Sequence, residues 1–395
     1  MSVRRTTGVS VAAVGALLIG GALPAMAATH PSGAAHRSAE AALHSVHVCT
    51  NPQAGHAACQ AEVTADSVGK PMATTGPTGL APATIKSVYG FPTSSTAGSG
   101  QTIAIVNAYD DPTAEADLQT FSTQFGLPGC TSASGCFTKL NQSGKATTYP
   151  ASDPTWALET SLDLQWAHAV APAAKLVLVE ATSSSLGNLT TAVRTAATKA
   201  GFVSNSWGAP ETSTESSLDT AFQGRGISYF VAAGDSGLPA QYPSASPYVV
   251  SVGGTTLHFD TTGAFSSETG WSSSGGGCSL YESAPAAQSA FAQYAAVGCA
   301  GKRATPDVSL DADPASGVAV YDSTPYSGTT GWFTVGGTSA ATPMWAARSA
   351  IAGTQVTPAT VYGSSLTFRD ITSGNNGAAA GAGYDLNTGR GSRLG

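Results

Sequence analysis

Charged side chains are scarce in this sequence. Only 10% of its 395 residues are Asp, Glu, Lys or Arg, and 17 basic against 24 acidic residues leave a formal net charge of −7. A protein that binds nucleic acid through bulk positive charge is therefore excluded. Hydrophobic residues make up 42%, so the chain is not disordered as a whole and can bury the core of one large domain or two ordinary ones.

Long apolar runs are also missing beyond the N-terminus, which argues against a membrane span. At the N-terminus, Arg4 and Arg5 precede an apolar run over residues 9–23, and Ala25-Met26-Ala27 supplies the small residues that a signal peptidase reads. We predict that residues 1–27 are a secretory signal and that the protein is secreted, extracellular and free of the membrane once the signal is cleaved. The export route stays open.

The six cysteines include no C-x-x-C pair, which argues against zinc-thiolate or thioredoxin-type chemistry. An even number of cysteines in a secreted chain favours disulfides. Proximity along the sequence suggests Cys49 with Cys59, Cys130 with Cys136, and Cys278 with Cys299. Other pairings remain open, because six cysteines allow many connectivities.

Histidine is nearly absent outside one segment. Five of the seven histidines lie within residues 30–56, which leaves His168 and His258 for the rest of the chain. Residues 28–76 are rich in Ala, Gly and His and show no sustained periodicity, so we interpret them as a short propeptide or a flexible arm. The histidines there are irregularly spaced, which makes a metal site the less favoured interpretation.

Residues 77–395 carry the pattern of one α/β domain. Short apolar strands are expected at residues 101–108, 175–180, 201–207 and 227–233, and helices at 153–170, 186–200 and 216–224. Strands alternating with helices predict a doubly wound, mostly parallel sheet with helices on both faces. Ligands of such folds bind beyond the carboxyl ends of the strands.

The sharpest chemical signal is the run Gly336-Gly337-Thr338-Ser339-Ala340-Ala341-Thr342-Pro343, which precedes an apolar helical run over residues 344–352. A Ser at a helix start lies at the positive end of the helix dipole, where a developing negative charge is favoured. An ordinary capping Ser is the alternative. The complete run resembles the nucleophile motif of the subtilisin-like peptidase fold, which favours Ser339 as a nucleophile.

A histidine triad cannot accompany this serine. Neither His168 nor His258 lies in a His-Gly-Thr setting, and the strand at 101–108 has Asn107 where a subtilisin would have its triad Asp. The helix at 153–170 instead carries Glu159 and Asp163 at i, i+4 spacing, on one face. A solvated acidic face is the alternative, but most of this helix surface is apolar, with Trp156, Leu158, Leu162, Leu164 and Trp166.

A further carboxylate, Asp235, stands in Ala232-Ala233-Gly234-Asp235-Ser236-Gly237, where a subtilisin has its oxyanion-hole Asn. Ser339, Glu159, Asp163 and Asp235 together resemble the sedolisin, or serine-carboxyl peptidase, family. The resemblance spans roughly residues 77–395. It also includes the segments at 204–208, 251–255, 274–277 and 306–314.

This resemblance implies a role for each catalytic residue in peptide-bond hydrolysis through an acyl-enzyme. Ser339 would be the nucleophile, Glu159 the general base and acid, and Asp163 the group that orients Glu159. Asp235 would stabilise the oxyanion and must be protonated to do so. Two neighbouring carboxyls share a proton more readily than they both ionise. We therefore expect activity at acid pH.

Substrate-binding residues are expected beside these groups. Ser206, Trp207 and Gly208 resemble an edge whose backbone pairs with an extended substrate, and Ser274 and Gly275 resemble part of the facing wall. Ordinary turns are the alternative for both segments. We interpret Asp307, Asp311 and Asp313 as turn and capping carboxylates rather than as a second acid or metal site.

The resemblance also implies one structural Ca²⁺ near the C-terminus. The side chains of Asp370 and Asp385 and the carbonyls of Ile371, Gly381 and Gly383 would hold it. Calcium is bound by several oxygen ligands, and a Gly-rich loop can bring backbone carbonyls together. A turn-rich terminus without an ion is the alternative.

The chain departs from the resemblance at its N-terminus, since sedolisins generally carry a large prodomain and only residues 28–76 are available here. Two other functions would require different residues. A non-catalytic binding protein on this scaffold is expected to lack one of the four catalytic residues, and an esterase is expected to use G-x-S-x-G with a His. We therefore expect protein or peptide substrates and a monomer. Cleavage preference and the choice between endopeptidase and tripeptidyl-peptidase stay open.

Overall fold

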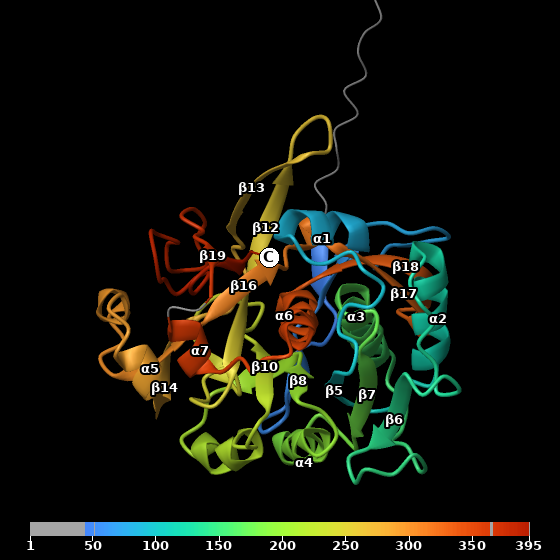
Figure 1. The fold of residues 1–395 in the computed structure, drawn as a ribbon, viewed down its shortest axis with the longest axis horizontal. Coiled ribbons are helices and arrows are strands. Elements are labelled where there is room, and N and C mark those ends of the chain that lie inside the picture. The colour runs from blue at the N-terminus through green and yellow to red at the C-terminus, as the bar shows by residue number, and fades with distance from the viewer. Residues whose placement is uncertain (1–43, 51, 364–365, 395) are drawn as a thin grey trace, which may run out of the picture. The chain divides into compact units, whose positions relative to one another are not determined.

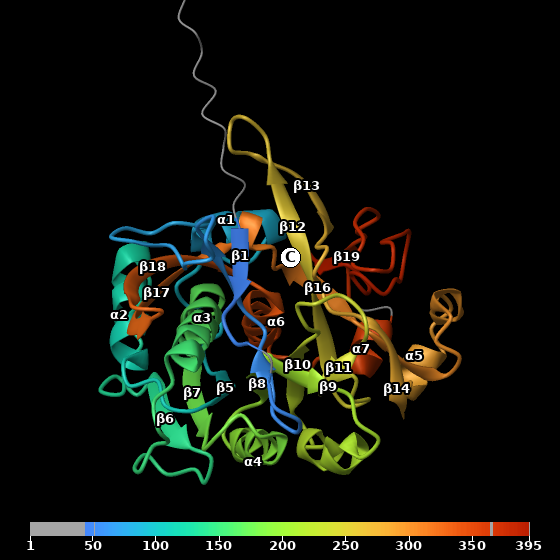
Figure 2. The same ribbon diagram turned by 180° about the vertical axis from the view of Figure 1, so that it is seen from behind.

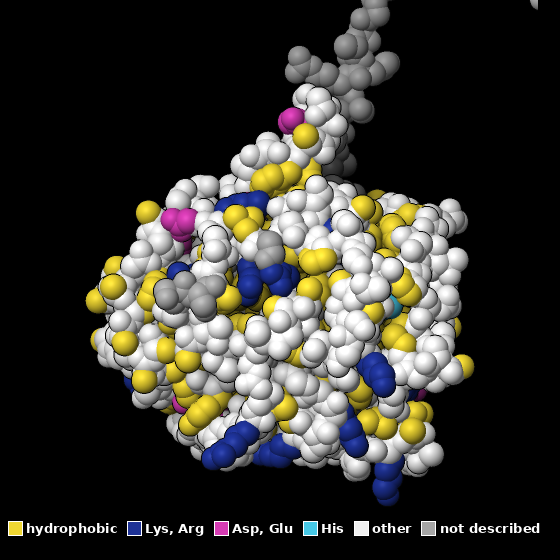
Figure 3. Space-filling model, viewed as in Figure 1, with side chains coloured by type: hydrophobic (Ala, Val, Ile, Leu, Met, Phe, Trp, Pro, Cys, Tyr) yellow, Lys and Arg dark blue, Asp and Glu magenta, His cyan; other side chains and the backbone are white. Residues whose placement is uncertain are grey.

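The computed structural model describes residues 44–50, 52–363 and 366–394. The predicted signal at residues 1–27 and the first part of the predicted arm lie outside the described residues. Within the described part, no helix combines the length and apolar character needed to cross a membrane. Charged side chains on the face shown in Figure 3 are few and scattered among neutral ones.

Within the described residues, the central sheet has ten strands, in the order β19-β20-β16-β12-β10-β8-β5-β7-β6, with β13 beside β12 (Figure 1). The neighbours from β6 through to β20 pair in parallel, and the antiparallel pairs are those of β13 and β19. The mostly parallel sheet that the sequence predicts is confirmed. Its strands are β5 (Thr102–Ala108), β6 (Phe137–Asn141), β7 (Lys175–Ala181), β8 (Phe202–Asn205), β10 (Ser228–Ala232), β12 (Val250–Phe259), β13 (Phe265–Gly270), β16 (Val308–Asp311), β19 (Phe368–Arg369) and β20 (Ser392–Arg393).

Helices cover both faces of this sheet because its central strands are apolar on both sides. Helices α3 (Pro154–Val170) and α6 (Thr338–Ala352) pack against each other and against the central strands. Helix α4 (Leu186–Ala197) packs on the opposite face, as Figures 1 and 2 show. The other α-helices in the part of the chain that the structure describes are α1 (Pro82–Tyr89), α2 (Ala114–Phe125), α5 (Ala286–Ser289) and α7 (Pro358–Tyr362).

Two expected elements differ from the prediction. The segment at 216–224 is a 3₁₀ helix, η1 (Glu215–Phe222), rather than an α-helix. The expected strand at 201–207 is divided into β8 and β9 (Trp207–Pro210), with Ser206 between them. The division matters because β9 leaves the central sheet and pairs with β2 (Ala58–Cys59) and β11 (Gln241–Tyr242).

Helix α3 begins where the sequence predicts. The side chain of Asp153 accepts hydrogen bonds from the backbone N–H groups of Thr155 and Trp156, and Pro154 occupies the first helical position. From Trp156 to its end at Val170, every residue of the helix is buried. An acidic residue on this helix is therefore enclosed by protein, whichever way it points.

A second, five-stranded sheet contains much of the predicted N-terminal arm. Its strands are β1 (His44–His47), β3 (Glu62–Ala65), β4 (Ala73–Thr74), β17 (Val318–Tyr326) and β18 (Thr329–Gly336). Strand β3 is fully buried between β1 and β18, so its backbone is paired on both edges. The expectation of a flexible arm is therefore wrong for the described part of residues 28–76, while the propeptide interpretation stays a prediction.

All three disulfides suggested by sequence proximity are present: Cys49–Cys59, Cys130–Cys136 and Cys278–Cys299. The first closes the loop between β1 and β2. The third links β14 (Gly277–Ser283) to the segment before β15 (Lys302–Thr305), and these two strands pair with each other. No cysteine is left free.

Candidate active site

Ser339 is the second residue of α6 and is fully buried. The preceding Gly337 has a φ of +93°, a conformation that L side chains rarely adopt. A Cβ added to Gly337 would lie 2.3 Å from the carbonyl oxygen of Gln60 and 2.5 Å from Oδ2 of Asp235. Only glycine fits here, and its absence of a side chain lets these two oxygens approach the start of the helix.

The two carboxylates of α3 lie one helical turn apart, and both are fully buried. Asp163 is held on both oxygens: Oδ1 accepts from the hydroxyl of Ser206 at 2.6 Å and Oδ2 accepts from Nδ2 of Asn107 at 3.0 Å. Neither oxygen of Glu159 has a hydrogen-bond partner among the described residues. The alternative of a solvated acidic face is thereby excluded.

This enclosure changes the acidity of the pair. Burial raises the pKa of Glu159 well above its usual range, and the charge of Asp163 raises it further, while the nearby Ser339 hydroxyl lowers it. Burial also raises the pKa of Asp163, to about 7, against the opposing hydrogen bonds from Ser206 and Asn107. The Ser339 hydroxyl itself donates to the carbonyl of Ser206 at 3.3 Å. The pair therefore holds a proton in acid solution.

Asp235 follows β10 and is almost completely buried. Its Oδ1 accepts hydrogen bonds from the backbone N–H of Thr338 at 2.8 Å and from the hydroxyl of Thr338 at 2.7 Å. Its Oδ2 has no partner among the described residues. Burial raises the pKa of Asp235 well above its usual range, and the nearby Glu62 raises it further. A protonated Oδ2 would be a hydrogen-bond donor that is free to bind a ligand oxygen.

The four residues predicted to be catalytic are thus brought together at the start of α6. The carbonyl oxygen of Gln60 already lies where these residues meet. The backbone N–H of Ser339 donates to the carbonyl oxygen of Gln60 at 2.9 Å. The N–H of Ser339, a fixed hydrogen-bond donor, and the unpaired Oδ2 of Asp235 thus both lie beside the carbonyl group of Gln60.

The predicted binding edge at 206–208 does pair with an extended segment. Gly208 is opposite Ala58 and Trp207 is opposite Cys59 in the antiparallel pair of β9 with β2. The Trp207 side chain instead packs in the core, where its Nε1 donates to the Val106 carbonyl. The predicted binding edge therefore offers backbone groups rather than the indole.

Ser274 and Gly275 lie against the loop that precedes Asp235. The Ser274 hydroxyl accepts from the N–H of Gly254 and donates to the carbonyl of Asn387. The N–H of Gly275 donates to the Gly234 carbonyl, and a Cβ there would come within 2.1 Å of the Ala233 carbonyl oxygen. These contacts join the segment to the loop before Asp235, and direct contact with a substrate stays a prediction.

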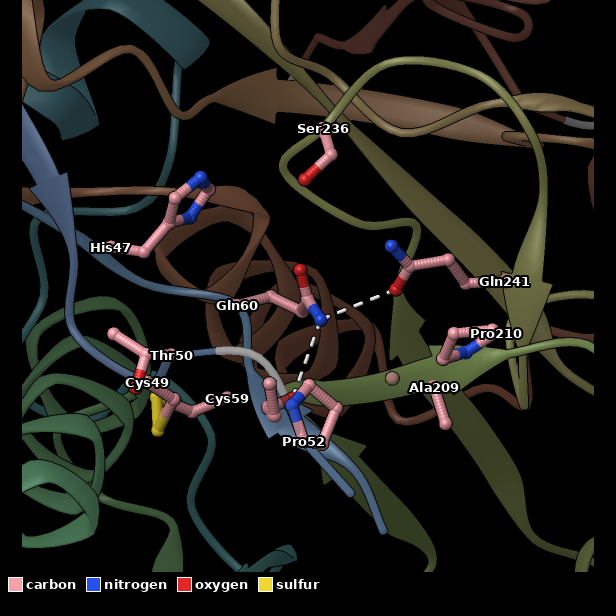
Figure 4. A pocket seen from close by; sticks show the side chains of 12 residues that line it. His47, Cys49, Thr50, Pro52, Cys59, Gln60, Ala209, Pro210, Ser236 and Gln241 are labelled. Atoms are coloured by element: carbon pink, nitrogen blue, oxygen red, sulfur yellow. Dashed lines mark hydrogen bonds between the residues drawn. A yellow bond between two sulfur atoms is a disulfide. The ribbon is translucent and has the colours of Figure 1, made fainter. Parts of the chain in front are cut away.

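Two residues that sequence reasoning missed lie in the pocket beside the site (Figure 4). The side-chain amide of Gln60 donates to Oε1 of Gln241 at 3.2 Å and to the carbonyl of Ala58 at 3.3 Å. The pocket that holds this amide is lined by Gly208, Ser236 and Gln241, among others. No local pattern marks these residues, because each lies in a short strand or loop without periodicity.

The predicted calcium ligands gather around one loop near the C-terminus. The carboxylate of Asp370 accepts from the N–H of Gly383, at 2.9 Å from Oδ2, and Oδ2 of Asp385 accepts from the N–H of Gly381 at 2.9 Å. Ile371 directly follows Asp370 and is buried. Two carboxylates beside a loop that carries several glycine carbonyls are a hard oxygen donor set of the kind that fits Ca²⁺.

Comparisons with known proteins show which family the chain is similar to. The Subtilase family model matches residues 151–372, more than half of the chain. Kumamolisin from Bacillus sp. (strain MN-32) is 33% identical over 364 residues, covering 81% of this chain and 63% of that protein. Sedolisin from Pseudomonas sp. (strain 101) is 36% identical over 176 residues, covering 38% of this chain and 28% of that protein. The chain thus spans less than two thirds of the length of these relatives.

Solved structures show the same similarity. Pseudomonas sedolisin, a serine-carboxyl proteinase complexed with two molecules of pseudo-iodotyrostatin, superposes with a TM-score of 0.67 at 28% identity, covering 82% of this chain and 96% of that one. The S41 psychrophilic protease shares the fold, with a TM-score of 0.54 at 20% identity over 82% of this chain and 99% of that one. The chain therefore belongs to the subtilase family and, within it, to the sedolisin group with its subtilisin-like fold.

Proposed function

We propose that the chain is a serine-carboxyl peptidase that hydrolyses peptide bonds in acid solution. The observation that carries this proposal is the convergence of Ser339, Glu159, Asp163 and Asp235 at the start of α6, around a carbonyl oxygen that already accepts the Ser339 N–H. The 33% identity to kumamolisin and the likeness to Pseudomonas sedolisin support it.

In the acylation step, the hydroxyl oxygen of Ser339 attacks the carbonyl carbon of the substrate. Glu159 takes the hydroxyl proton and passes it to the nitrogen of the leaving amine as the carbon–nitrogen bond breaks. Water then attacks the acyl-enzyme, with Glu159 again receiving a proton and returning it to the Ser339 oxygen. Asp163, held rigidly by Ser206 and Asn107, orients Glu159 and stabilises the proton shared by the pair.

In both steps a negative charge develops on the substrate carbonyl oxygen. The N–H of Ser339 and the protonated carboxyl of Asp235 donate hydrogen bonds to it. If Asp235 ionised, its charge would repel the oxyanion. This requirement, together with the buried carboxyl pair, is the physical reason to expect activity in acid.

A single Ca²⁺ is proposed as the structural cofactor. Asp370 and Asp385, with the carbonyls of Ile371, Gly381 and Gly383, would hold it. When bound, the ion would hold the loop over residues 370–385 together through its charge. It would take no part in the reaction. Because it would neutralise two carboxylates close to one loop, it would stabilise the C-terminal part of the domain.

Protein or peptide substrates, an extracellular location and a monomeric state complete the proposal. A substrate strand would pair with β9, as β2 does in this structure. A non-catalytic binding protein is the remaining alternative. Such a protein would have the groove but would not cleave peptide bonds.

The experiment compares the purified chain with a Ser339→Ala variant on denatured casein, from pH 3 to pH 8. Ser349→Ala is the matched control, because Ser349 is a buried serine of the same helix. We expect cleavage in acid by the parent and the control, and a loss of at least about 10³-fold in the Ser339→Ala variant. Absence of cleavage by the folded parent at every pH would favour the binding protein.

A further inference from the structure

A histidine and two carboxyl groups from separate segments meet beside the start of α6. Each of His47, Glu62 and Asp235 offers one ligand atom, and these three atoms lie within 4.8 Å of one another. His47 ends β1 and Glu62 begins β3, whereas Asp235 follows β10. The catalytic steps proposed above use Asp235 and leave the other two side chains without a role.

The pairing of β1 with β3 explains why His47 lies beside Glu62. The two strands are antiparallel and His47 is directly opposite Glu62, so their side chains lie on the same face of the sheet. Nδ1 of His47 is 3.7 Å from Oε1 of Glu62. The other oxygen, Oε2, accepts the hydroxyl of Ser45 at 2.6 Å. This hydrogen bond fixes the carboxyl group and leaves Oε1 for the imidazole or for an ion.

The pairing of β3 with β18 brings this face of the sheet to the catalytic residues. Glu62 is opposite Gly336, which directly precedes Gly337. On the other side of Gly337 lies Oδ2 of Asp235, 2.5 Å from the place of a Cβ on this glycine. This oxygen is buried and has no hydrogen-bond partner among the described residues. A buried oxygen without a partner costs free energy, so it is the atom of Asp235 that is free to bind an ion.

The charges around this cluster are unbalanced. Within the described residues, neither Glu62 nor Asp235 forms an ion pair with a lysine or an arginine. The partner of Glu62 is His47, which carries a charge only when it is protonated. A third acidic residue, Asp313, adds its negative charge to the surroundings of Glu62. A divalent cation would balance the two carboxylates that face each other here.

The cluster can be reached from solvent through the pocket in Figure 4. His47 and Ser236, the residue after Asp235, both line this pocket. The side chain of His47 is 47% exposed. An ion that enters the pocket can therefore bind the imidazole and keep a water molecule as a further ligand.

The ligand atoms select the kind of ion. One imidazole nitrogen and two carboxylate oxygens suit Zn²⁺, which takes three protein ligands of this kind together with a water molecule in open tetrahedral sites. Ca²⁺ and Mg²⁺ prefer oxygen ligands alone. Zinc bonds of about 2.0–2.2 Å hold neighbouring ligand atoms roughly 3.3–3.6 Å apart. The 3.7 Å between His47 and Glu62 is close to this spacing.

We infer that His47, Glu62 and Asp235 form a binding site for a divalent transition-metal ion, Zn²⁺, and that the bound ion switches catalysis off. An oxygen of Asp235 that is bound to a metal ion cannot at the same time donate a hydrogen bond to an oxyanion. The ion would also join β1 and β3 to the loop after β10. The metal site rests on the geometry of the three side chains, whereas its effect on catalysis rests on the proposed peptidase function.

The binding test uses the full chain with Ser339→Ala, so that the site is measured without peptide hydrolysis. Calorimetric titration with Zn²⁺ at neutral pH, in excess Ca²⁺, should show a site whose affinity falls at least about tenfold in His47→Ala. His44→Ala is the matched control, because His44 is an exposed histidine of the same strand and lies opposite Ala65 rather than Glu62. This control should bind Zn²⁺ like its parent. Equal binding by the two variants would overturn the site.

A second variant separates this site from one made of histidines alone. Glu62→Gln keeps the size of the side chain and removes its charge, so the affinity for Zn²⁺ should again fall at least about tenfold. Glu115→Gln, on α2 and outside the cluster, is the control with unchanged binding expected. Unchanged binding in Glu62→Gln would show that the two carboxyl groups are not ligands and would overturn the proposed site.

Peptide hydrolysis by the parent tests the effect on catalysis. At the highest pH at which the parent cleaves an added peptide, Zn²⁺ should lower the rate, and His47→Ala should need at least about tenfold more Zn²⁺ for the same loss. Zinc binding that leaves hydrolysis unchanged overturns the switch and leaves the peptidase function standing. If the parent cleaves no peptide at any pH without added Zn²⁺, the peptidase function and the switch fail together, and the calorimetric titration alone decides the metal site.

Discussion

Asn107, near the carboxyl end of β5, donates its side-chain N–H to Oδ2 of Asp163 on α3 at 3.0 Å. The same amide also donates to the Thr160 hydroxyl at 3.1 Å. The contact links the central sheet to the helix that carries the carboxyl pair. Because an amide does not ionise, it positions Asp163 without adding a further carboxyl group to a buried site.

Replacing this amide by a carboxyl should therefore harm catalysis. In Asn107→Asp a third buried carboxyl would raise the pKa of the pair further, so Glu159 would ionise at higher pH and the acid limb of kcat/KM should move upward. We expect a loss of about tenfold at the acid end of the profile. Asn107→Ala, which removes the donor without adding an acid, should move that limb less. An unchanged profile in Asn107→Asp would contradict the role given to this contact.

Asp235→Asn should extend activity toward neutral pH. The amide oxygen can still accept from Thr338, and the amide nitrogen donates at every pH, whereas the parent carboxyl stops donating when it ionises. The alkaline limb of kcat/KM should therefore move upward, with activity in acid kept within about tenfold of the parent. Asp235→Ala is the control, with an expected loss of about 10²–10³. An alkaline limb that stays in place would assign it to another group.

The folded protein should be more stable in acid than at neutral pH. Burial raises the pKa of Asp111 and of Asp163 to about 7, and of Asp322 to about 8. Between the ordinary carboxyl pKa of about 4 and these values, the folded state binds more protons than the unfolded state. The stabilisation is complete below about pH 4 and is lost as pH rises through 7 and 8.

Urea unfolding of the Ser339→Ala variant at pH 4 and pH 7.5 measures this effect without self-digestion. Each buried carboxyl contributes about 1.4 kcal/mol for each pH unit between its two pKa values. Asp322→Asn should show a weaker pH dependence than its parent. A free energy of unfolding that rises from pH 4 to pH 7.5 would contradict the prediction.

Removal of calcium should lower the thermal stability. A strong chelator is expected to reduce Tm by several degrees, since binding to the folded state alone stabilises it. In Asp370→Ala, which removes a proposed ligand, the chelator should have little effect. Asp260→Ala, an exposed aspartate in a hairpin turn, is the control that should respond like the parent. A parent Tm that does not change in chelator would count against a structural ion.

The buried pair of Arg303 and Asp307 should be sensitive to loss of one partner. Asp307, expected to be a turn or capping carboxylate, instead lies against the Arg303 guanidinium and accepts the Tyr362 hydroxyl at 2.5 Å, with all three side chains buried. Arg303→Met leaves Asp307 uncompensated and should cost about 3–5 kcal/mol. Arg303→Met combined with Asp307→Leu should recover part of this loss in urea unfolding. A cost below about 1 kcal/mol for the single variant would be inconsistent with a buried, coupled pair.

Local patterns predicted the elements whose signals lie close together in the sequence. Asp153-Pro154 marks the start of α3, and the i, i+4 spacing of Glu159 and Asp163 follows from helix geometry. The glycines before Ser339 mark the start of α6 in the same way. Sequence proximity also suggested all three disulfides, because short loops bring cysteines together in any compact fold.

Other features could not be predicted because they depend on contacts between distant segments. The split at Ser206 arises because β9 turns away from the central sheet to pair with β2. Gly275 donates its N–H to the carbonyl of Gly234, in the loop before Asp235. In both cases the partner that fixes the position of the residue lies far from it in the sequence.

The sequence by itself therefore determined the α/β class, the helix starts and the residue types available for catalysis, since these depend on periodicity, caps and side-chain chemistry over a few turns. Only the tertiary structure decided that both oxygens of Glu159 and Oδ2 of Asp235 are buried without a hydrogen-bond partner among the described residues, and that Gln60 lies against Ser339. The physical reason is that burial and backbone pairing are properties of segments that meet in space. In the sequence, Gln60 is separated from Ser339 by most of the chain.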